Sequence, residues 1–200
     1  SLYFIIWNFC FKKKKKRNEN SLIKPENFYG DCKSRTQKLI LSLRKEKSLF
    51  ISSAIAYNHE SVLTPKNHLI PNLVGKFINA KGKIIKIYNP NEFRNISHVY
   101  DFLPIFEKIL LLEKPNDFIM ANDINYKILD IAKIINKNFY NNKFKIKVQR
   151  DKKISISRKA DNIKIKKLFN YEPSYDIHKI LKRFFSYEKK FAQWILIKKS

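Results

Sequence analysis

The chain has 200 residues, which is long enough to bury one sizeable hydrophobic core. Its composition, 44% hydrophobic and 14% aromatic, excludes an intrinsically disordered protein. The two cysteines, Cys10 and Cys32, exclude a disulfide framework, predict no metal site and favour a reducing, cytoplasmic compartment.

The formal net charge of +25 would suit an anionic partner such as a nucleic acid. The charge comes mostly from lysines spread along the whole chain among Asn and Ile, as a codon bias toward A and T would produce. Sequence-specific nucleic-acid binding uses Arg, Asn and Gln on one groove-facing element, and no such element is evident. We therefore interpret the lysines as solvated and expect no nucleic-acid partner.

The first residues combine an apolar stretch with a positive run. Leu2–Phe11 is apolar but has only about half the length that a membrane span needs. The basic run Lys12–Arg17 follows this stretch, whereas a signal peptide carries its positive charges first. We expect neither a signal peptide nor a membrane span. A solvated charge run is favoured over a segment that binds an acidic membrane surface.

Hydrophobic periodicity predicts helices and strands that alternate along the chain. The predicted helices cover residues 34–47, 73–82, 99–112, 126–139, 161–169 and 177–185. The predicted strands cover residues 48–57, 83–88, 117–121 and 144–148. The first strand is a continuous apolar run, which is typical of a strand buried on both faces of a parallel sheet. The alternation predicts an α/β fold, with Ser97 as the cap of the third helix.

Tyr29 and Lys33 are the first candidates for chemistry. They are four residues apart at the start of a helix, so both side chains can face the same side. A Lys beside a Tyr favours the phenolate form that a Tyr acid/base needs. Taken without context, a surface Tyr and a surface Lys are the favoured interpretation of this pair.

Two segments of the sequence give this pair its context. Residues 25–33 (PENFYGDCK) contain a Tyr-x-x-x-Lys pattern after a Pro, and residues 57–61 (YNHES) follow about one helix and one strand later. The first segment resembles the Tyr-x-x-x-Lys segment of the extended short-chain dehydrogenases of the NAD-dependent epimerase/dehydratase group. The second is similar to the Phe-Asn-His-Glu-Ser run of one family in this group, the GDP-mannose 4,6-dehydratases.

Two later segments extend the resemblance, which covers residues 18–185. Residues 89–101 (NPNEFRNISHVYD) are similar to the family's Gly-Asn…Arg-Asp-Trp…His…Asp-Tyr block. Arg150, Asp161 and Pro173 stand where the family has Arg-Pro…Gly-Asp…Trp-x-Pro. The four segments together, in this order, are far more specific than the Tyr-x-x-x-Lys pattern alone.

The resemblance implies catalytic and cofactor-binding roles for three residues. Tyr29 would be the acid/base that takes the proton of the sugar 4-hydroxyl while hydride passes to a nicotinamide. Lys33 would bind the nicotinamide ribose and hold Tyr29 as phenolate. His59 would contact the cofactor. The expected cofactor is NADP, with NAD as the alternative.

The resemblance also implies a substrate, GDP-mannose or a related nucleotide sugar. Asn58 would lie against the nucleotide sugar, and Arg94 would bind its diphosphate through a bidentate contact that suits Arg better than Lys. Arg150 is a second candidate for the same anion. The implied reaction converts GDP-mannose to GDP-4-keto-6-deoxy-mannose and water. Relatives are homo-oligomers, and the helix from Ser34 would belong to a helical interface in many of them.

The implied architecture is the carboxy-terminal part of a Rossmann-type parallel sheet plus a small mixed α/β substrate-binding lobe. We expect a divergent or frame-shifted segment at 1–20 and a remnant of the dinucleotide-binding domain at 21–60. The substrate-binding lobe with returning sheet elements is expected at 61–185, and a tail at 186–200.

The chain departs from the family pattern at three places. Ile5, Ile6 and Trp7 stand where the family has the Thr/Ser-Ser-Glu segment that supplies the carboxylate for elimination. Thr64 replaces an Arg that helps to hold the cofactor phosphate, and Asn72 and Leu73 replace an Arg-Lys pair.

The third departure concerns the Gly-rich turn of a Rossmann domain. The three glycines, Gly30, Gly75 and Gly82, cannot form this turn, so we expect an amino-terminal truncation. The departures make activity, and not ancestry, the point that experiment must decide. Another nucleotide-sugar epimerase, which needs only the Tyr and the Lys, and a non-catalytic sugar-nucleotide-binding protein remain alternatives.

Overall fold

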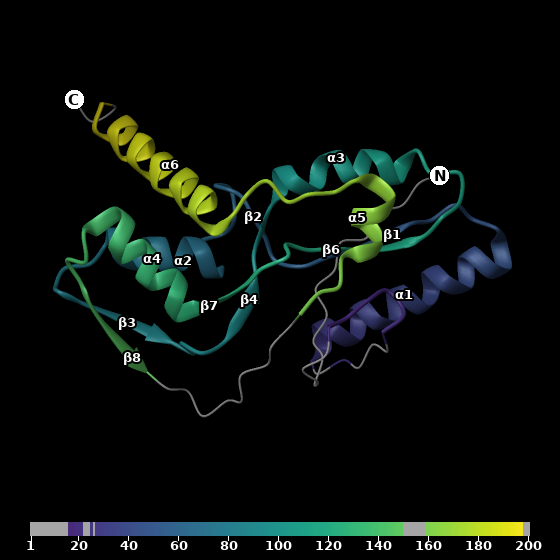
Figure 1. Ribbon diagram of the computed structural model, residues 1–200, viewed down its shortest axis with the longest axis horizontal. Coiled ribbons are helices and arrows are strands. Elements are labelled where there is room, and N and C mark those ends of the chain that lie inside the picture. Colours follow the sequence, from purple (N-terminus) through teal and green to yellow (C-terminus); the bar gives the residue numbers. More distant parts are fainter. Residues whose placement is uncertain (1–15, 22–24, 26, 150–158, 198–200) are drawn as a thin grey trace. The chain divides into compact units, whose positions relative to one another are not determined.

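The computed structural model of the chain describes residues 16–21, 25, 27–149 and 159–197 (Figure 1). The chain forms two compact units, each built from three stretches of sequence. Unit 1 contains the described residues up to His59, then Phe93–Asn125, then the described residues up to Ser174. Unit 2 contains Glu60–Glu92, then Tyr126 and the described residues that follow it, and then the described residues from Tyr175 onward.

The described part of the chain contains the helices and strands that the periodicity predicts, and four short strands that it does not predict. The helices are α1 (Phe28–Lys47), α2 (Leu69–Ile78), α3 (Val99–Leu110), α4 (Ile128–Tyr140), α5 (Ile163–Phe169) and α6 (Ile177–Ile197). The strands are β1 (Ser53–Ala56), β2 (His59–Glu60), β3 (Ile84–Tyr88), β4 (Phe93–Asn95), β5 (Ser97–His98), β6 (Asp117–Met120), β7 (Asn125–Lys127) and β8 (Lys145–Gln149). The expected α/β class is confirmed.

Unit 1 is organised around the parallel strands β1 and β6, which pair from Ser53 with Asp117 to Ala56 with Met120. Successive side chains of a strand point to opposite faces of the sheet. Helix α3 covers one face and helix α1 the other, so the strands lie between two helical layers (Figure 1). Every residue of β1 is buried, which explains its unbroken apolar sequence.

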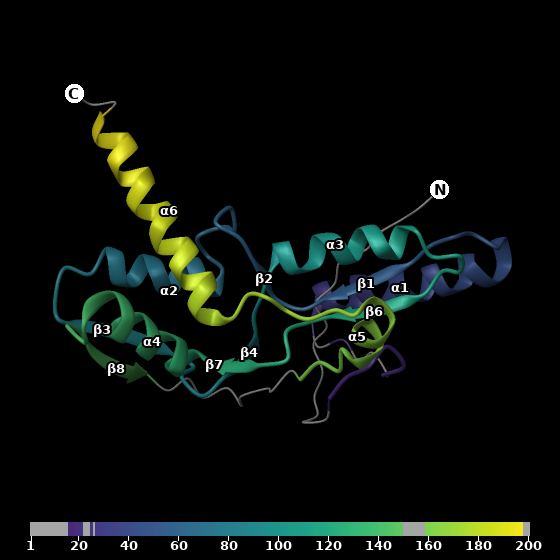
Figure 2. The same ribbon diagram turned by 45° about the horizontal axis from the view of Figure 1, so that its top comes forward.

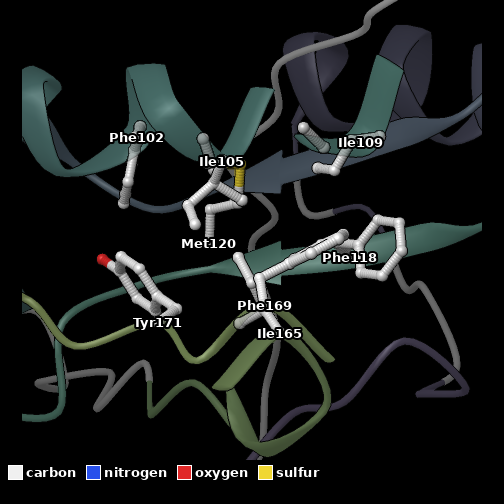
Figure 3. Packing of buried hydrophobic residues seen from close by; sticks show 10 residues of the cluster. Phe102, Ile105, Ile109, Phe118, Met120, Ile165, Phe169 and Tyr171 are labelled. Atoms are coloured by element: carbon white, nitrogen blue, oxygen red, sulfur yellow. The ribbon is translucent and has the colours of Figure 1, made fainter. Parts of the chain in front are cut away.

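The α3 side of this sheet carries the larger apolar cluster. Figure 3 shows Phe102, Ile105 and Ile109 of α3 lying over Phe118 and Met120 of β6. Helix α5 closes the cluster from its other side with Ile165 and Phe169. Burying a large apolar side chain contributes about 1.5 to 3 kcal/mol, so this cluster is a main source of the stability of unit 1.

The α1 side is held by polar contacts as well as by apolar packing. Gln37 donates from Nε2 to Asp117 Oδ2 over 2.9 Å, and its Oε1 accepts from Ser53 Oγ over 3.0 Å. Arg44 forms an ion pair with the same Asp117, and both side chains are about 85% buried. Buried polar groups that are fully paired fix a unique arrangement. Helix α1 is therefore fixed in position along the sheet.

The outer edge of β6 is closed by three side chains that bond to its backbone. Glu19 Oε1 accepts from the Ile119 N–H over 2.9 Å. Lys164 donates to the Asp117 carbonyl, and Asn162 donates from Nδ2 to the carbonyl of the residue after the strand, Ala121. An edge strand with bonded backbone groups does not pair with another chain. Among the described strands, β6 is therefore the last of its sheet.

Unit 2 contains a second pair of parallel strands, β3 and β8, which pair from Ile84 with Lys145 to Tyr88 with Gln149. In β3 the side chains alternate between exposed and buried, so only one face of this sheet is covered. Helix α4 contacts β3 on the covered face and packs against α2 (Figure 2). Phe77 of α2 stacks on Tyr140 and meets Phe144 edge-on, each pair with ring centroids 5.6 Å apart.

Several predicted boundaries are wrong, most of them by a few residues. The last helix, α6, continues to Ile197, well beyond its predicted end at residue 185 and into the predicted tail. Helix α1 begins at Phe28, six residues before the predicted start, because Asn27 caps it. The first strand is limited to Ser53–Ala56, the residues that pair with β6. Ser97 is not the cap of α3. The cap is His98, whose Nδ1 accepts from the Tyr100 N–H over 3.1 Å.

Candidate functional site

Tyr29 and Lys33 lie in the first turns of α1, as the sequence predicts. Asn27 Oδ1 accepts from the Gly30 N–H over 2.8 Å, and this cap starts the helix just before Tyr29. A Cβ atom at Gly30 would lie 3.3 Å from the same Asn27 oxygen, so a residue without a side chain suits the cap.

The two side chains share one side of the helix. Lys33 Nζ lies 5.5 Å from the centroid of the Tyr29 ring, within the range of a cation–π contact. Tyr29 is 54% exposed, so its phenol is accessible to a ligand.

Asn58 and His59 follow β1 directly, at the carboxyl end of the parallel sheet. The Asn58 carbonyl accepts from the Ser97 N–H over 2.8 Å, which fixes the backbone at this point. Ligands of open parallel α/β sheets bind outside the carboxyl ends of the strands. Asn58 and His59 therefore lie at the end of the sheet to which this general rule applies.

The His59 ring is held from two sides. Its Nδ1 lies 3.0 Å from the Tyr57 carbonyl oxygen, which accepts from the tautomer that carries the proton on Nδ1. The ring also packs at a tilt against Phe102, with centroids 5.6 Å apart. In that tautomer Nε2 is a hydrogen-bond acceptor.

Arg94 lies in β4 and is half-buried. The next residue, Asn95, is buried, and its side-chain amide bonds to the backbone of Asn122. Arg150 and the predicted substitutions at residues 5–7 lie outside the described residues. Five of the six predicted site residues are thus described, and all five belong to unit 1.

Thr64, which replaces a family Arg, is used within its own turn. Its Oγ1 accepts from the Ser61 N–H over 2.9 Å. The Glu60 carboxyl, which is 3% exposed, also bonds to Thr64. Burial raises the pKa of Glu60 to about 7, and the bond from Thr64 opposes this rise. The Thr64 hydroxyl therefore serves the turn that carries Glu60.

Sequence reasoning missed several residues that position the site. The sequence assigns no role to Glu19, and the structure shows its carboxylate accepting from the backbone of β6. Asp101 accepts from both the N–H and the Oγ of Ser174, over 2.9 and 2.6 Å. These contacts join segments that are 73 to 100 residues apart, and no local pattern signals them.

A cavity of about 380 Å³ lies beside α1 in unit 1. Ser34, Gln37, Lys38 and Leu41 form one wall, and residues 17–21 form another. None of the five described candidate residues lines this cavity. We therefore assign the candidate site to the start of α1 and the carboxyl end of β1, and not to the cavity.

Two other kinds of site receive no support from the part of the chain that the structure describes. Within it, no three His, Cys, Asp or Glu side chains gather in a way that could hold a metal ion. Of the described helices, none combines the length and the apolar character needed to cross a membrane.

Residues 11–184 match the family model described as GDP-mannose 4,6 dehydratase. This chain belongs to that family. The match spans Tyr29, Lys33, Asn58, His59, Arg94 and Arg150. No curated protein matches the chain in sequence.

Solved structures of nucleotide-sugar enzymes share the fold. The dTDP-glucose 4,6-dehydratase of Bacillus anthracis, solved with NAD, aligns with a TM-score of 0.82 and 18% identity over 96% of this chain. The UDP-glucuronic acid 4-epimerase of Bacillus cereus, solved with UDP-glucuronic acid and NAD, aligns with a TM-score of 0.80, 17% identity and 95% coverage. RMD from Pseudomonas aeruginosa, complexed with NADPH, aligns with a TM-score of 0.77 and 13% identity over 92% of this chain.

This chain spans 62% of the length of each of the first two solved proteins and 65% of the third. The alignments show that these proteins share the fold of this chain. The chain has the mixed α/β, Rossmann-like fold of the short-chain dehydrogenases, with parallel β1 and β6 as members of its sheet.

Proposed function

We propose that this chain is the Tyr- and Lys-bearing, sugar-nucleotide-binding part of a GDP-mannose 4,6-dehydratase. The reaction converts GDP-mannose to GDP-4-keto-6-deoxy-mannose and water. The observation that carries the proposal is the Tyr29–Lys33 pair at the start of α1, with the ammonium 5.5 Å from the ring. This pair lies in a chain that belongs to the family over most of its length.

The Tyr29 oxygen would act as the base that removes the proton from the sugar 4-hydroxyl. Tyr29 is half exposed at the start of its helix, so a sugar hydroxyl can approach it. Lys33 stabilises the negative charge of the phenolate before the proton arrives. A bound nicotinamide cofactor supplies the acceptor for the hydride that leaves C4. The polar network of Gln37 and Arg44 keeps α1, and with it Tyr29, at a fixed place.

The described residues fit one end of a nicotinamide dinucleotide. Tyr29, Lys33 and His59 offer the phenol, ammonium and imidazole that would hold the nicotinamide riboside. The pyrophosphate end needs a Gly-rich turn before a helix. Gly30 and Gly75 lie inside helices instead, and Gly82 lies between α2 and β3. We propose NADP, with NAD as the alternative, and assign only the nicotinamide end to these residues.

Asn58 and Arg94 would bind the nucleotide sugar. A guanidinium can donate two parallel hydrogen bonds to a diphosphate, and such charge-assisted pairs are among the strongest in proteins. Arg94 belongs to the block that is similar to the family's Arg-Asp-Trp segment. Arg150 stays a proposed second contact to the same anion.

The elimination of the 6-hydroxyl requires a carboxylate that takes the C5 proton. Among the described residues near α1, Glu19 is bonded to the backbone of β6 and Asp31 pairs with Arg35 over 2.8 Å. Neither is placed for this step. An epimerase that uses only the Tyr and Lys is therefore the second candidate.

The test incubates the protein with GDP-mannose and NADP, and separately with NAD, and identifies the products by mass spectrometry and NMR. A 4-keto-6-deoxy product that Tyr29→Phe abolishes supports the proposal. Interconversion of stereoisomers would instead establish the epimerase. Binding of GDP-mannose without any product would establish a sugar-nucleotide-binding protein, and no binding at all would overturn the assignment.

We further propose that the protein is cytoplasmic and forms homo-oligomers through α1. Leu39 of α1 is 56% exposed, which supports an apolar contact on this helix. Cys32 is a free, exposed thiol, which fits a reducing compartment. Sedimentation velocity on the protein and its Leu39→Lys variant would test the oligomer, because the charge should lower the association constant.

A further inference from the structure

Asn95 clamps β4 to the turn that follows β6. Its Nδ2 donates to the Asn122 carbonyl over 2.7 Å, and its Oδ1 accepts from the Asn122 N–H over 2.9 Å. Asn95 is 2% exposed and Asn122 is 7% exposed, so water does not replace these bonds. An uncharged amide offers a donor and an acceptor on one planar group. A carboxylate at this place could accept one bond but could not donate the other.

The far side of the clamp is itself fixed. Asn122 Oδ1 accepts from the Ile124 N–H over 3.2 Å, which tightens the turn. Asn162 donates from Nδ2 to Ala121 O and to Asp123 Oδ1, over 2.9 and 3.0 Å. The turn 121–124 is therefore tied to the start of α5, and Asn95 bonds to a rigid partner.

Arg94 directly precedes Asn95 in β4. In a strand, neighbouring side chains point to opposite faces, so Asn95 is directed inward while Arg94 is directed to the other face. Fixing the inward side chain fixes the backbone at β4, and thus the direction in which the Arg94 side chain leaves it. A bidentate contact depends on this direction, because small misplacements of a binding group lower its effectiveness strongly.

We propose that Asn95 is a positioning residue that holds Arg94 in place for the diphosphate of the sugar nucleotide. The inference rests on the proposed function, in which Arg94 binds that diphosphate. The family block to which this segment is similar has Asp after the Arg, so the clamp by an amide is a property of this chain. Asn95→Asp restores the family residue and, as the carboxylate, removes the donor to the Asn122 carbonyl and the longer contact of the same group with the Ile124 carbonyl.

The chain contains a matched control in unit 2. Asn136, which is 6% exposed, makes the same reciprocal pair with the backbone of Phe144. Its Nδ2 donates to the carbonyl over 2.8 Å, and its Oδ1 accepts from the N–H over 3.1 Å. Asn136→Asp removes the equivalent donor from a pair that belongs to the other unit.

The experiment is a double-mutant cycle read by calorimetric titration with GDP-mannose. The four proteins are the unsubstituted chain, Arg94→Ala, Asn95→Asp and the double variant, and thermal midpoints are recorded for each. We expect Asn95→Asp to weaken binding about tenfold, and to have no further effect once Arg94 is Ala, because residues that act through one contact are not additive. Asn136→Asp should lower the midpoint comparably and leave the affinity within twofold.

Two results would overturn this inference and leave the proposed function unaffected. One is an additive cycle, in which Asn95→Asp weakens binding equally with and without Arg94. The other is an Asn136→Asp variant that loses as much affinity as Asn95→Asp, since the loss would then follow from stability. Absence of GDP-mannose binding by the unsubstituted chain would overturn the proposed function as well. If Asn95→Asp does not fold, Asn95→Ser replaces it in the same cycle.

Discussion

The two units each contain a pair of parallel strands, but the pairs are built differently. In unit 1, β1 and β6 lie between two helical layers, and side chains bond to the outer backbone edge of β6. In unit 2, β3 and β8 are covered on one face, and the other face presents exposed residues such as Ile84 and Lys86. A strand buried on both faces has no freedom to shift its register.

The difference agrees with the location of the candidate residues. Tyr29, Lys33, Asn58, His59 and Arg94 all belong to unit 1. Tyr29 and Lys33 lie on α1, which is bonded to the doubly covered sheet. Asn58 and His59 follow its strand β1, and Arg94 lies on β4, which Asn95 bonds to the turn after β6. Catalytic groups need a rigid support, and unit 1 supplies it.

The largest effect is expected in the core of unit 1. Phe118→Ala removes a side chain that is fully buried between α3 and α5, and should lower the free energy of unfolding by about 3 to 5 kcal/mol. Ile84→Ala on the exposed face of β3 should change it by less than about 1 kcal/mol. Urea titrations followed by circular dichroism measure both. Equal losses would contradict the contrast between the two sheets.

The second-largest loss of stability is expected when the polar contacts between α1 and the sheet are removed. Arg44→Ala leaves the buried Asp117 without its cation and should cost about 3 kcal/mol. Arg35→Ala breaks an ion pair of the same types whose Arg side chain is 79% exposed, and should cost less than about 0.5 kcal/mol. A matching loss in the two variants, measured by the same urea titrations, would show that α1 is not held through Arg44.

The third effect is a pH dependence in unit 2. The pKa of Glu60 is about 7 in the folded chain and 4.5 when unperturbed, so the folded state holds this proton more tightly. Its contribution is complete below pH 4.5 and is lost as the pH rises to about 7, by up to about 3 kcal/mol. Glu60→Gln should flatten this part of the stability profile. An unchanged slope between pH 4.5 and 7 would contradict the burial of an acid here.

The smallest effect concerns the cap that places Tyr29. Asn27→Ala removes the acceptor for the Gly30 N–H and should cost about 1 kcal/mol. Fraying of the first turn should lower the turnover that depends on Tyr29 more than it lowers GDP-mannose binding at Arg94. Asn27→Asp keeps the acceptor and is the control. A loss of binding without a loss of turnover would speak against this role of the cap.

The sequence predicts the elements better than it predicts their contacts. The apolar runs identify β1, β3 and β6 because burial on a sheet leaves a local pattern. The start of α1 is predicted late because its cap, Asn27, precedes the apolar stripe by several residues. The Tyr29–Lys33 geometry follows from helical spacing alone and is confirmed.

The contacts that support the site are not visible in the sequence. Asn95 and Asn122 are 27 residues apart, and Glu19 and Ile119 are 100 apart. A single Asn or Glu in a loop carries no periodic signal, and its partner is a backbone group of any residue type. The roles of Asn58, His59 and Arg94 stay predictions from the family resemblance.

The measurement that tests the central claim most directly is a calorimetric titration of the chain with GDP-mannose. The unsubstituted chain should bind, and Arg94→Ala should weaken binding by about tenfold or more, because hydrogen bonds to charged groups contribute about 1.5 to 3 kcal/mol. Arg183→Ala, which removes an exposed Arg that contacts Tyr175 in unit 2, should bind as the unsubstituted chain does. No binding, or equal binding by all three proteins, would contradict the assignment of this chain to sugar-nucleotide chemistry at Arg94.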